Sequence, residues 1–185
     1  MTPEIEGYRD QLLSIKQDVP GLVNQLTDVQ FNWRPEPGRW SIAQCLDHLN
    51  LTAAKFIPAI DAAIETARQR RLLSPGPFSY PLLERWFVRS QEPQAGIRVR
   101  TSKALAPPST LPRHDVISRF MDWQEQIDIR LQRADGLDLQ RAKQRSPILP
   151  ILTWRLGTFF ALTLAHERRH LWQARQVRID PKFPV

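Results

Sequence analysis

The stretch TLAHERRHLWQARQ, residues 163–176, decides what this sequence can fold into and what chemistry it can perform. It holds His166 and His170, two of the four histidines in the chain. Residues four apart on an α-helix lie on one side, about one turn from each other, so both imidazole rings leave the helix close together. The stretch therefore predicts a helix whose paired histidines can bind one metal ion.

The side of this helix that carries the histidines is otherwise apolar. Phe159 and Leu162 precede the pair at helical spacing, and Val177 follows it. Residues 167–169, one acidic and two basic, fall on other sides and are expected to face solvent. The histidines are expected to face a core, where a polar ring needs a partner. A metal ion is one such partner, and hydrogen bonds within a metal-free core are the other; the spacing leaves both open.

The run HERRH at residues 166–170 also matches the HExxH pattern of zinc proteases. In that reading Glu167 would act as general base beside a metal-bound water. Such proteases usually take a third ligand from downstream, and residues 171–185 contain no histidine and one carboxylate, Asp180. The sequence also lacks a strand-rich half. We therefore prefer another kind of metal site to a protease.

A third ligand is expected from upstream, where the sequence offers His48 and His114. His48 lies in the segment WSIAQCLDHLN, in which Ser41 and Gln44 have the spacing of a capping box at the start of a helix. This start places His48 about two turns into the helix. His114 follows LPR at the frayed start of another helix and is expected to be exposed. The predicted metal ligands are therefore His48, His166 and His170.

Three imidazoles on two facing helices leave coordination positions open, as in catalytic metal sites, where a water or a substrate thiol can bind. Imidazole binds several divalent metals; zinc and nickel are favoured here, and iron and manganese are compatible. Gln44 and Gln173 are predicted either to hold a metal-bound water and orient a ring, or to be helix-surface amides.

Apolar residues three and four apart predict long amphipathic helices over residues 4–19, 41–70, 115–133 and 154–177, and a short one over 82–89. Pro20 is expected to interrupt the first helix, and Pro58 to kink or divide the second. Trp33 and Trp40, in the loop between these two helices, are expected to be buried aromatic plugs.

Residues 74–112 contain seven of the sixteen prolines and form a predicted crossover between the second and third long helices. No strand pairing is predicted. The sequence thus predicts an all-α protein, a four-helix bundle with one long proline-rich crossover, folded as a single domain over residues 1–185.

Composition narrows the class of protein. The chain has 185 residues, 42% of them hydrophobic, which is enough for one domain with a proper core. No apolar run reaches membrane-spanning length, and the polar start MTPEIEGYRDQ is not a secretory signal. The lone cysteine, Cys45, excludes an internal disulfide and is expected to be a core residue rather than a nucleophile. We expect a cytoplasmic protein with no membrane partner.

The formal charge of +7 allows attraction to anionic substrates or to nucleic acid. The basic residues are scattered over the chain, however, and no helix-turn-helix or RNA-binding motif is present. A solvated basic surface is therefore preferred, and a nucleic-acid binder is the least favoured of the functions considered.

The chain resembles the DinB-like family, which includes YfiT-like metal-dependent hydrolases. The resemblance rests on WSxxxxxxH at residues 40–48 combined with HxxxHxxQ at 166–173. The segment over residues 26–35, which precedes the second helix, supports it. It implies a four-helix bundle in which His48, His166 and His170 bind metal. Relatives often carry a glutamate four residues before the first of these histidines, where this chain has Gln44. An uncharged amide there weakens any proton-transfer role at that position.

The resemblance also implies activities. Some members are thiol-dependent transferases or isomerases that use bacillithiol or mycothiol, others are known only as metal-binding bundles, and many form homodimers. The expected function is therefore that of a metal-dependent thiol S-transferase or hydrolase acting on a small electrophilic substrate. The alternative is a non-catalytic metal-binding or interaction bundle.

Overall fold

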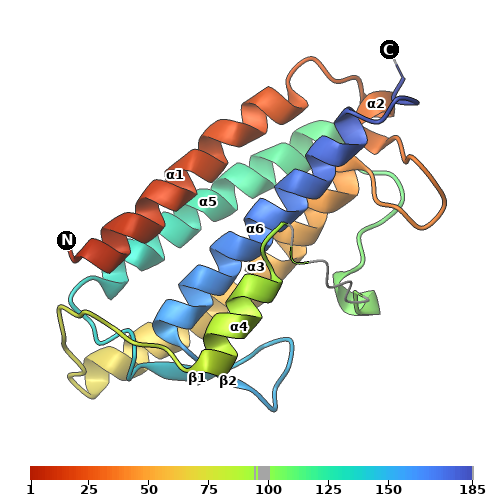
Figure 1. Cartoon of the computed structure of the whole chain (residues 1–185). Helices are drawn as coiled ribbons and strands as arrows, with labels where there is room; N and C mark the ends of the chain where they lie inside the picture. The colour runs from red at the N-terminus through yellow and green to blue at the C-terminus, as the bar shows by residue number, and fades with distance from the viewer. Residues whose placement is uncertain (94, 96–100, 185) are drawn as a thin grey trace.

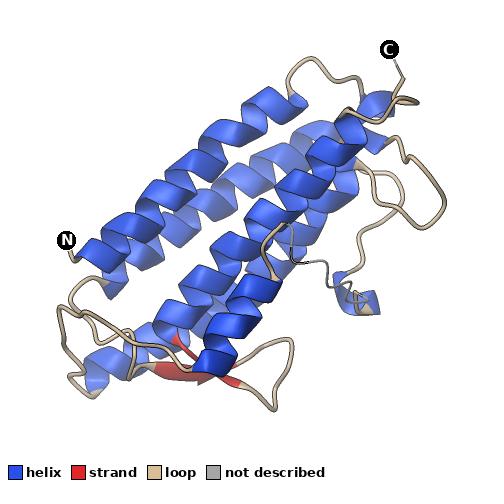
Figure 2. Cartoon of the chain, in the orientation of Figure 1, coloured by secondary structure: helices blue, strands red, loops and turns tan. Residues whose placement is uncertain are grey.

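The computed structural model describes residues 1–93, 95 and 101–184, and it is mostly helical, as the sequence predicts (Figures 1 and 2). Long helices run side by side along the molecule: α1 (Pro3–Val23), α3 (Ile42–Gln69), α5 (Arg113–Ala134) and α6 (Leu156–Arg178). Helices α1 and α3 each pack against both α5 and α6. In the part of the chain that the structure describes, no helix is long and apolar enough to cross a membrane.

Shorter elements occupy the ends and one flank of the long helices. They are α2 (Asp28–Asn32), α4 (Leu82–Ser90), the 3₁₀ helix η1 (Lys103–Leu105), and the strands β1 (Lys143–Arg145) and β2 (Thr153–Arg155). Helix α4 lies against α6 (Figure 1). Its bounds are close to the predicted range, residues 82–89. The two strands form an antiparallel pair, so the prediction that no strands pair is wrong. Each strand has only three residues, too few to show the alternation that identifies a strand in sequence.

The core lies where the apolar sides of the long helices meet. Its largest fully buried side chains come from all four and from α2: Ile5, Leu12, Phe31, Ile42, Leu46, Ile60, Ile64, Phe120, Ile127, Leu131, Phe159 and Phe160. Each buried side chain of this size contributes about 1.5–3 kcal/mol relative to an exposed one.

Two prolines lie inside helices that continue past them. Pro20 does not interrupt α1, which runs to Val23, and Pro58 does not divide α3. A proline inside a helix costs about 3 kcal/mol. The buried side chains beyond each proline, Leu22 and Val23 in α1 and Ile60 in α3, offset that cost by about 1.5–3 kcal/mol each. Tertiary burial therefore outweighs the local preference, and the expected interruption of α1 is wrong.

Helix α3 begins as the sequence predicts. The Ser41 hydroxyl accepts a hydrogen bond from the Gln44 backbone N–H at 3.1 Å, and the Gln44 side-chain oxygen accepts one from the Ser41 N–H at 3.1 Å. This capping box fixes the residue at which α3 begins. His48 lies about two turns into α3, on the side that packs against α6.

Gly157, at the start of α6, has no room for a side chain. A Cβ built there would lie 1.8 Å from the hydroxyl oxygen of Tyr80, which itself donates a hydrogen bond to Glu4 at 2.6 Å. We expect Gly157→Ala to lower the free energy of unfolding by about 1–3 kcal/mol, because Tyr80 must leave its place. Chemical denaturation measures the change. Gly7→Ala is the control, since a Cβ there meets nothing within 4 Å and should stabilise α1 by about 0.5–1 kcal/mol. Equal effects of the two changes would contradict this account.

Candidate metal centre

Three histidines meet between α3 and α6. His48 comes from α3, and His166 and His170 come from successive turns of α6. One ring nitrogen from each lies within 4.8 Å of the others, and Nε2 of His48 is 3.1 Å from Nε2 of His166. His48 and His170 are buried and His166 is partly buried. The structure thus brings together the three residues that the sequence selected; that they bind a metal stays a prediction.

Hydrogen bonds from outside the cluster orient two of the rings. Nδ1 of His48 donates to the backbone carbonyl of Leu105 at 2.8 Å, and Nδ1 of His166 donates to the side-chain oxygen of Gln91 at 3.2 Å. Since each Nδ1 then carries the proton, each Nε2 carries a lone pair. Two lone pairs 3.1 Å apart repel each other unless a cation lies between them. Two nitrogens bound to one zinc ion at about 2.1 Å lie about 3.0–3.4 Å apart, so the spacing fits a metal site.

The third ring supplies an independent test of that fit. Nδ1 of His170 is buried and has no hydrogen-bond partner among the described residues. A buried polar atom without a partner costs about 1–3 kcal/mol. Coordination of a metal ion through Nδ1 of His170 would remove this cost, whereas no hydrogen bond within the described residues does so.

The electrostatics of the cluster favour the metal-binding form of each ring. Burial lowers the pKa of His48 and lowers the pKa of His170 well below its ordinary value. For His166, burial first and then the neighbouring His48 and Arg169 lower the pKa to about 3. All three imidazoles are therefore neutral at pH 7, and neutral imidazole is the form that binds metal.

Trp40 covers two of the three histidines. Its ring stacks on that of His170, with centroids 5.6 Å apart and planes 26° apart, and it lies 4.9 Å from His48. The other tryptophan of this loop, Trp33, packs edge-on against Phe183 at 5.5 Å. Both rings are partly buried, which agrees with the expectation of aromatic plugs. Only Trp40 touches the site, where it keeps water from two of the rings.

Residues 167–169 do not form a solvent-facing side, and that expectation is wrong. Glu167 is 3% exposed and accepts a hydrogen bond from Gln124 of α5 at 2.9 Å. Burial raises the pKa of Glu167 to about 7, although the bond from Gln124 opposes the shift. Arg168 and Arg169 are partly buried, and bind Glu92 and the Ser90 carbonyl at the end of α4. The bond to Gln124 directs Glu167 toward α5, so the structure does not support its protease role as general base.

The remaining candidates lie as follows. The side-chain oxygen of Gln44 accepts a hydrogen bond in the capping box, and its nitrogen donates one to the carbonyl of Pro108 at 3.2 Å. A side-chain interaction with Gln173 opposes the lowering of the pKa of His170. His114 is outside the cluster with a side chain 92% exposed, as expected. Cys45 is buried, and burial raises the pKa of its thiol to about 12, so it is a core residue.

Sequence reasoning missed Gln91 and Leu105, which hold the rings of His166 and His48. Both belong to the proline-rich segment between α3 and α5. A backbone carbonyl carries no residue-type signal, and a single glutamine at the end of a short helix has no motif. The positions at which this segment meets the site could be found only from the three-dimensional structure.

The hydrogen bond from His166 to Gln91 allows the orientation of the His166 ring to be tested by mutation. We expect Gln91→Ala to weaken metal binding about 10–100-fold, because the partner of a metal-binding histidine sets its tautomer and direction. Competition with a chelator measures the affinity. Gln69→Ala, which removes an exposed glutamine bonded to Glu65 on α3, is the control and should leave the affinity unchanged. Unchanged affinity in Gln91→Ala as well would show that the bond does not orient His166.

The sequence profile of the DinB superfamily matches residues 11–174, which include all three histidines of the cluster. The chain therefore belongs to the DinB superfamily. No curated protein and no solved structure matches the sequence.

Proposed function

We propose that this protein is a metal-dependent enzyme that activates a low-molecular-weight thiol or a water against a small electrophilic substrate, as an S-transferase or a hydrolase. The observation that carries the proposal is the convergence of three neutral imidazoles, with no fourth ligand among the residues that the structure describes. Within the described residues, the group that could hold an ion consists of His48, His166 and His170 alone. A structural site normally has four protein ligands, so a three-histidine site leaves room for a reactant.

The residues around the cluster have separable roles in this proposal. Leu105 and Gln91 hold His48 and His166 with their Nε2 lone pairs inward, and Trp40 excludes water from one side. A bound divalent ion, with zinc or nickel favoured and iron or manganese compatible, would lower the pKa of a thiol or water and so supply the nucleophile. The chain's own contribution is to present neutral rings in one orientation.

The arrangement of the long helices and of the segment that connects two of them is also part of this proposal. We take α1, α3, α5 and α6 as the four-helix bundle of the DinB/YfiT type, and the proline-rich segment over 74–112 as its crossover. This segment reaches the histidines through Leu105 and Gln91, which supports its role as a wall of the site. The chain would form one domain over residues 1–185 and act as a cytoplasmic homodimer without nucleic acid.

A turnover experiment tests the enzyme hypothesis. Metal-loaded protein is incubated with bacillithiol or mycothiol and with a panel of electrophiles, such as aryl halides and epoxides, and product is followed by mass spectrometry. We expect turnover by the wild type and by His114→Ala, whose histidine is exposed and outside the cluster. His166→Ala should lose at least about a hundredfold, because one metal ligand is gone. Wild-type turnover in His166→Ala would refute the proposal.

The second candidate is a non-catalytic metal-binding or interaction bundle. Trp40 covers two of the three rings, and a site that only stabilises the fold would also be covered in this way. Metal-dependent stability without turnover of any thiol and electrophile pair would favour this candidate over the enzyme.

A further inference from the structure

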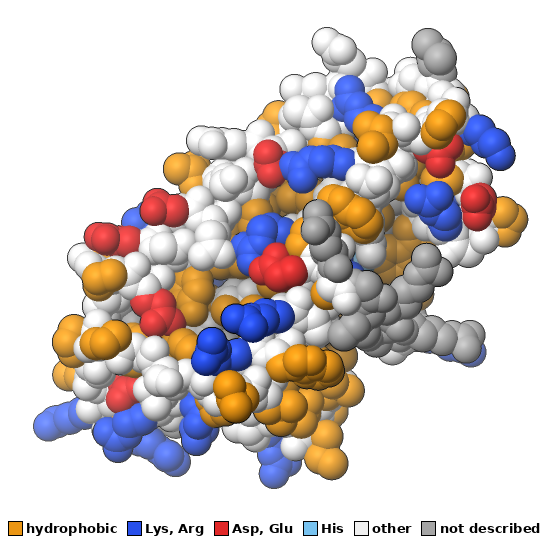
Figure 3. All heavy atoms as spheres, viewed as in Figure 1, with side chains coloured by type: hydrophobic (Ala, Val, Ile, Leu, Met, Phe, Trp, Pro, Cys, Tyr) orange, Lys and Arg blue, Asp and Glu red, His pale blue; other side chains and the backbone are white. Residues whose placement is uncertain are grey.

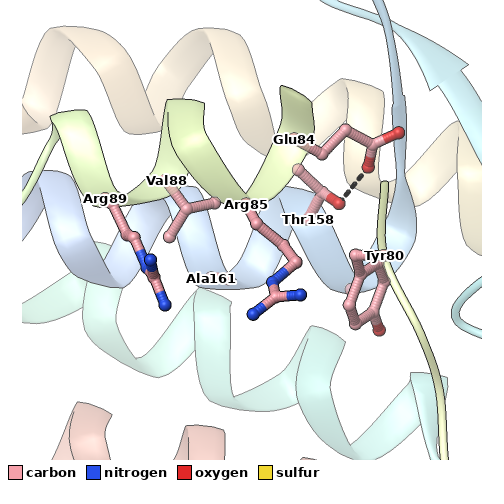
Figure 4. A pocket seen from close by; sticks show the side chains of 8 residues that line it. Tyr80, Glu84, Arg85, Val88, Arg89, Thr158 and Ala161 are labelled. Atoms are coloured by element: carbon pink, nitrogen blue, oxygen red, sulfur yellow. Dashed lines mark hydrogen bonds between the residues drawn. The ribbon is translucent and has the colours of Figure 1, made fainter. Parts of the chain in front are cut away.

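A cavity of about 200 Å³ lies between α4 and α6, away from the histidines. Figure 4 shows the side chains around it. The floor is made of Gly157, Thr158 and Ala161 of α6, and Tyr80 and Val88 form further walls. The cavity exists because α6 presents only small side chains where α4 crosses it. Since Tyr80 occupies the space beside Gly157, no larger residue at that position could fill the hollow.

Two arginines of α4 line the same cavity. Arg85 and Arg89 are four residues apart, and Figure 4 shows both guanidinium groups directed to the same side of α4, beside Ala161. Both side chains are exposed, and in Figure 3 basic side chains gather over this helix. Two like charges at this spacing on a helix repel each other. They therefore favour a counter-charge between them.

No counter-charge comes from the described part of the chain. Among the described residues, neither the Arg85 nor the Arg89 side chain has a hydrogen bond or ion pair, and the acidic groups around them are already engaged. Glu84 binds Arg155 and the Thr158 hydroxyl, and Glu4 accepts from Tyr80. The cavity thus joins an apolar floor to two unneutralised cations.

We propose that this cavity binds a small organic anion, a carboxylate or phosphate ester on a short apolar chain. The anionic head would lie between Arg85 and Arg89, whose planar groups match the oxygens of both kinds of anion. The chain would lie on Val88 and Ala161. A volume of about 200 Å³ suits a small ligand, on the order of a six-carbon acid. The site is separate from the proposed metal centre and does not rest on the proposed function.

An NMR titration of the ¹⁵N-labelled protein tests the proposal, with hexanoate, butyl phosphate and the neutral isostere hexanamide as probes. We expect saturable shifts at residues 82–90 and 156–161, with a dissociation constant on the order of 1 mM for at least one anion. Hexanamide should bind at least about tenfold more weakly, since it cannot pair with the guanidinium groups. The tighter of the two anions identifies the head group.

Three variants separate charge, shape and general effects. Arg85→Gln combined with Arg89→Gln should weaken anion binding at least about tenfold, and Ala161→Leu should do the same by filling the floor. Arg141→Gln, which removes an exposed arginine outside the cavity, should change binding less than about twofold. Melting temperatures confirm that each variant is folded. The proposal is overturned if neither anion saturates, if hexanamide binds as tightly, or if the double variant binds like the wild type.

Discussion

Replacing His170 with alanine is expected to abolish metal binding and metal-dependent stabilisation together. The wild type should contain about one metal ion per chain, because three rings converge on one point. Metal in thousandfold excess over its dissociation constant stabilises a protein by about 4 kcal/mol. In a domain of this size, each kcal/mol raises the melting temperature by about 2–4 °C. We therefore expect metal to raise it by roughly 8–16 °C in the wild type and not in the variant.

Elemental analysis of protein purified without an affinity tag measures the stoichiometry, and thermal melts with and without a chelator measure the stabilisation. His114→Ala is the matched control: it removes the histidine whose side chain is 92% exposed and should keep both properties. If neither the wild type nor the variant holds metal after reconstitution with zinc, nickel or manganese, the metal hypothesis is wrong. The histidines would then be core residues.

Glu84→Ala should be among the most destabilising substitutions outside the hydrophobic core. The Glu84 side chain is only 7% exposed, and it binds both the Arg155 guanidinium and the Thr158 hydroxyl between α4, β2 and α6. Its removal leaves two largely buried polar partners unpaired. Removing one partner of a buried ion pair lowers the free energy of unfolding by about 3–5 kcal/mol, because the other charge is left buried and unpaired. We expect a loss of about 3 kcal/mol in the free energy of unfolding, measured by urea denaturation.

Asp61→Ala makes the matched comparison. Asp61 also forms ion pairs, to Arg130 and Arg133, but its side chain is 31% exposed. Water can solvate the partners that remain, so the loss should be about 1 kcal/mol or less. Equal losses in the two variants would show that burial does not decide the strength of these ion pairs.

Local patterns were sufficient to predict the helices and the identity of the cluster. The apolar stripes located the long helices, and Ser41 with Gln44 located the start of α3. Spacing put His166 and His170 on one side of α6, and the choice of His48 over the exposed His114 followed from the capping box. In each case the physical cause acts within a few residues of the chain, so the sequence carries the signal.

Other features depend on contacts between distant segments. Glu167 stands next to a histidine in sequence, yet Gln124 of another helix holds it in the interior. Pro20 should interrupt α1 by local rules, but the burial of residues beyond it carries the helix onward. The paired strands were missed because three residues are too short for a pattern.

The periodicity of its apolar residues makes this chain helical and puts the histidine pair on one face of its last helix, since both properties arise from the geometry of a single helix. Tertiary packing decided the direction and protonation of the rings. The carbonyl of Leu105 and the amide of Gln91 turn the Nε2 lone pairs of His48 and His166 toward each other, and Trp40 covers the rings of His48 and His170. These three groups meet the histidines only because α3, α6, the loop that precedes α3 and the segment between α3 and α5 fold together. A hydrogen bond between residues 57 or 75 positions apart leaves no pattern in a single sequence.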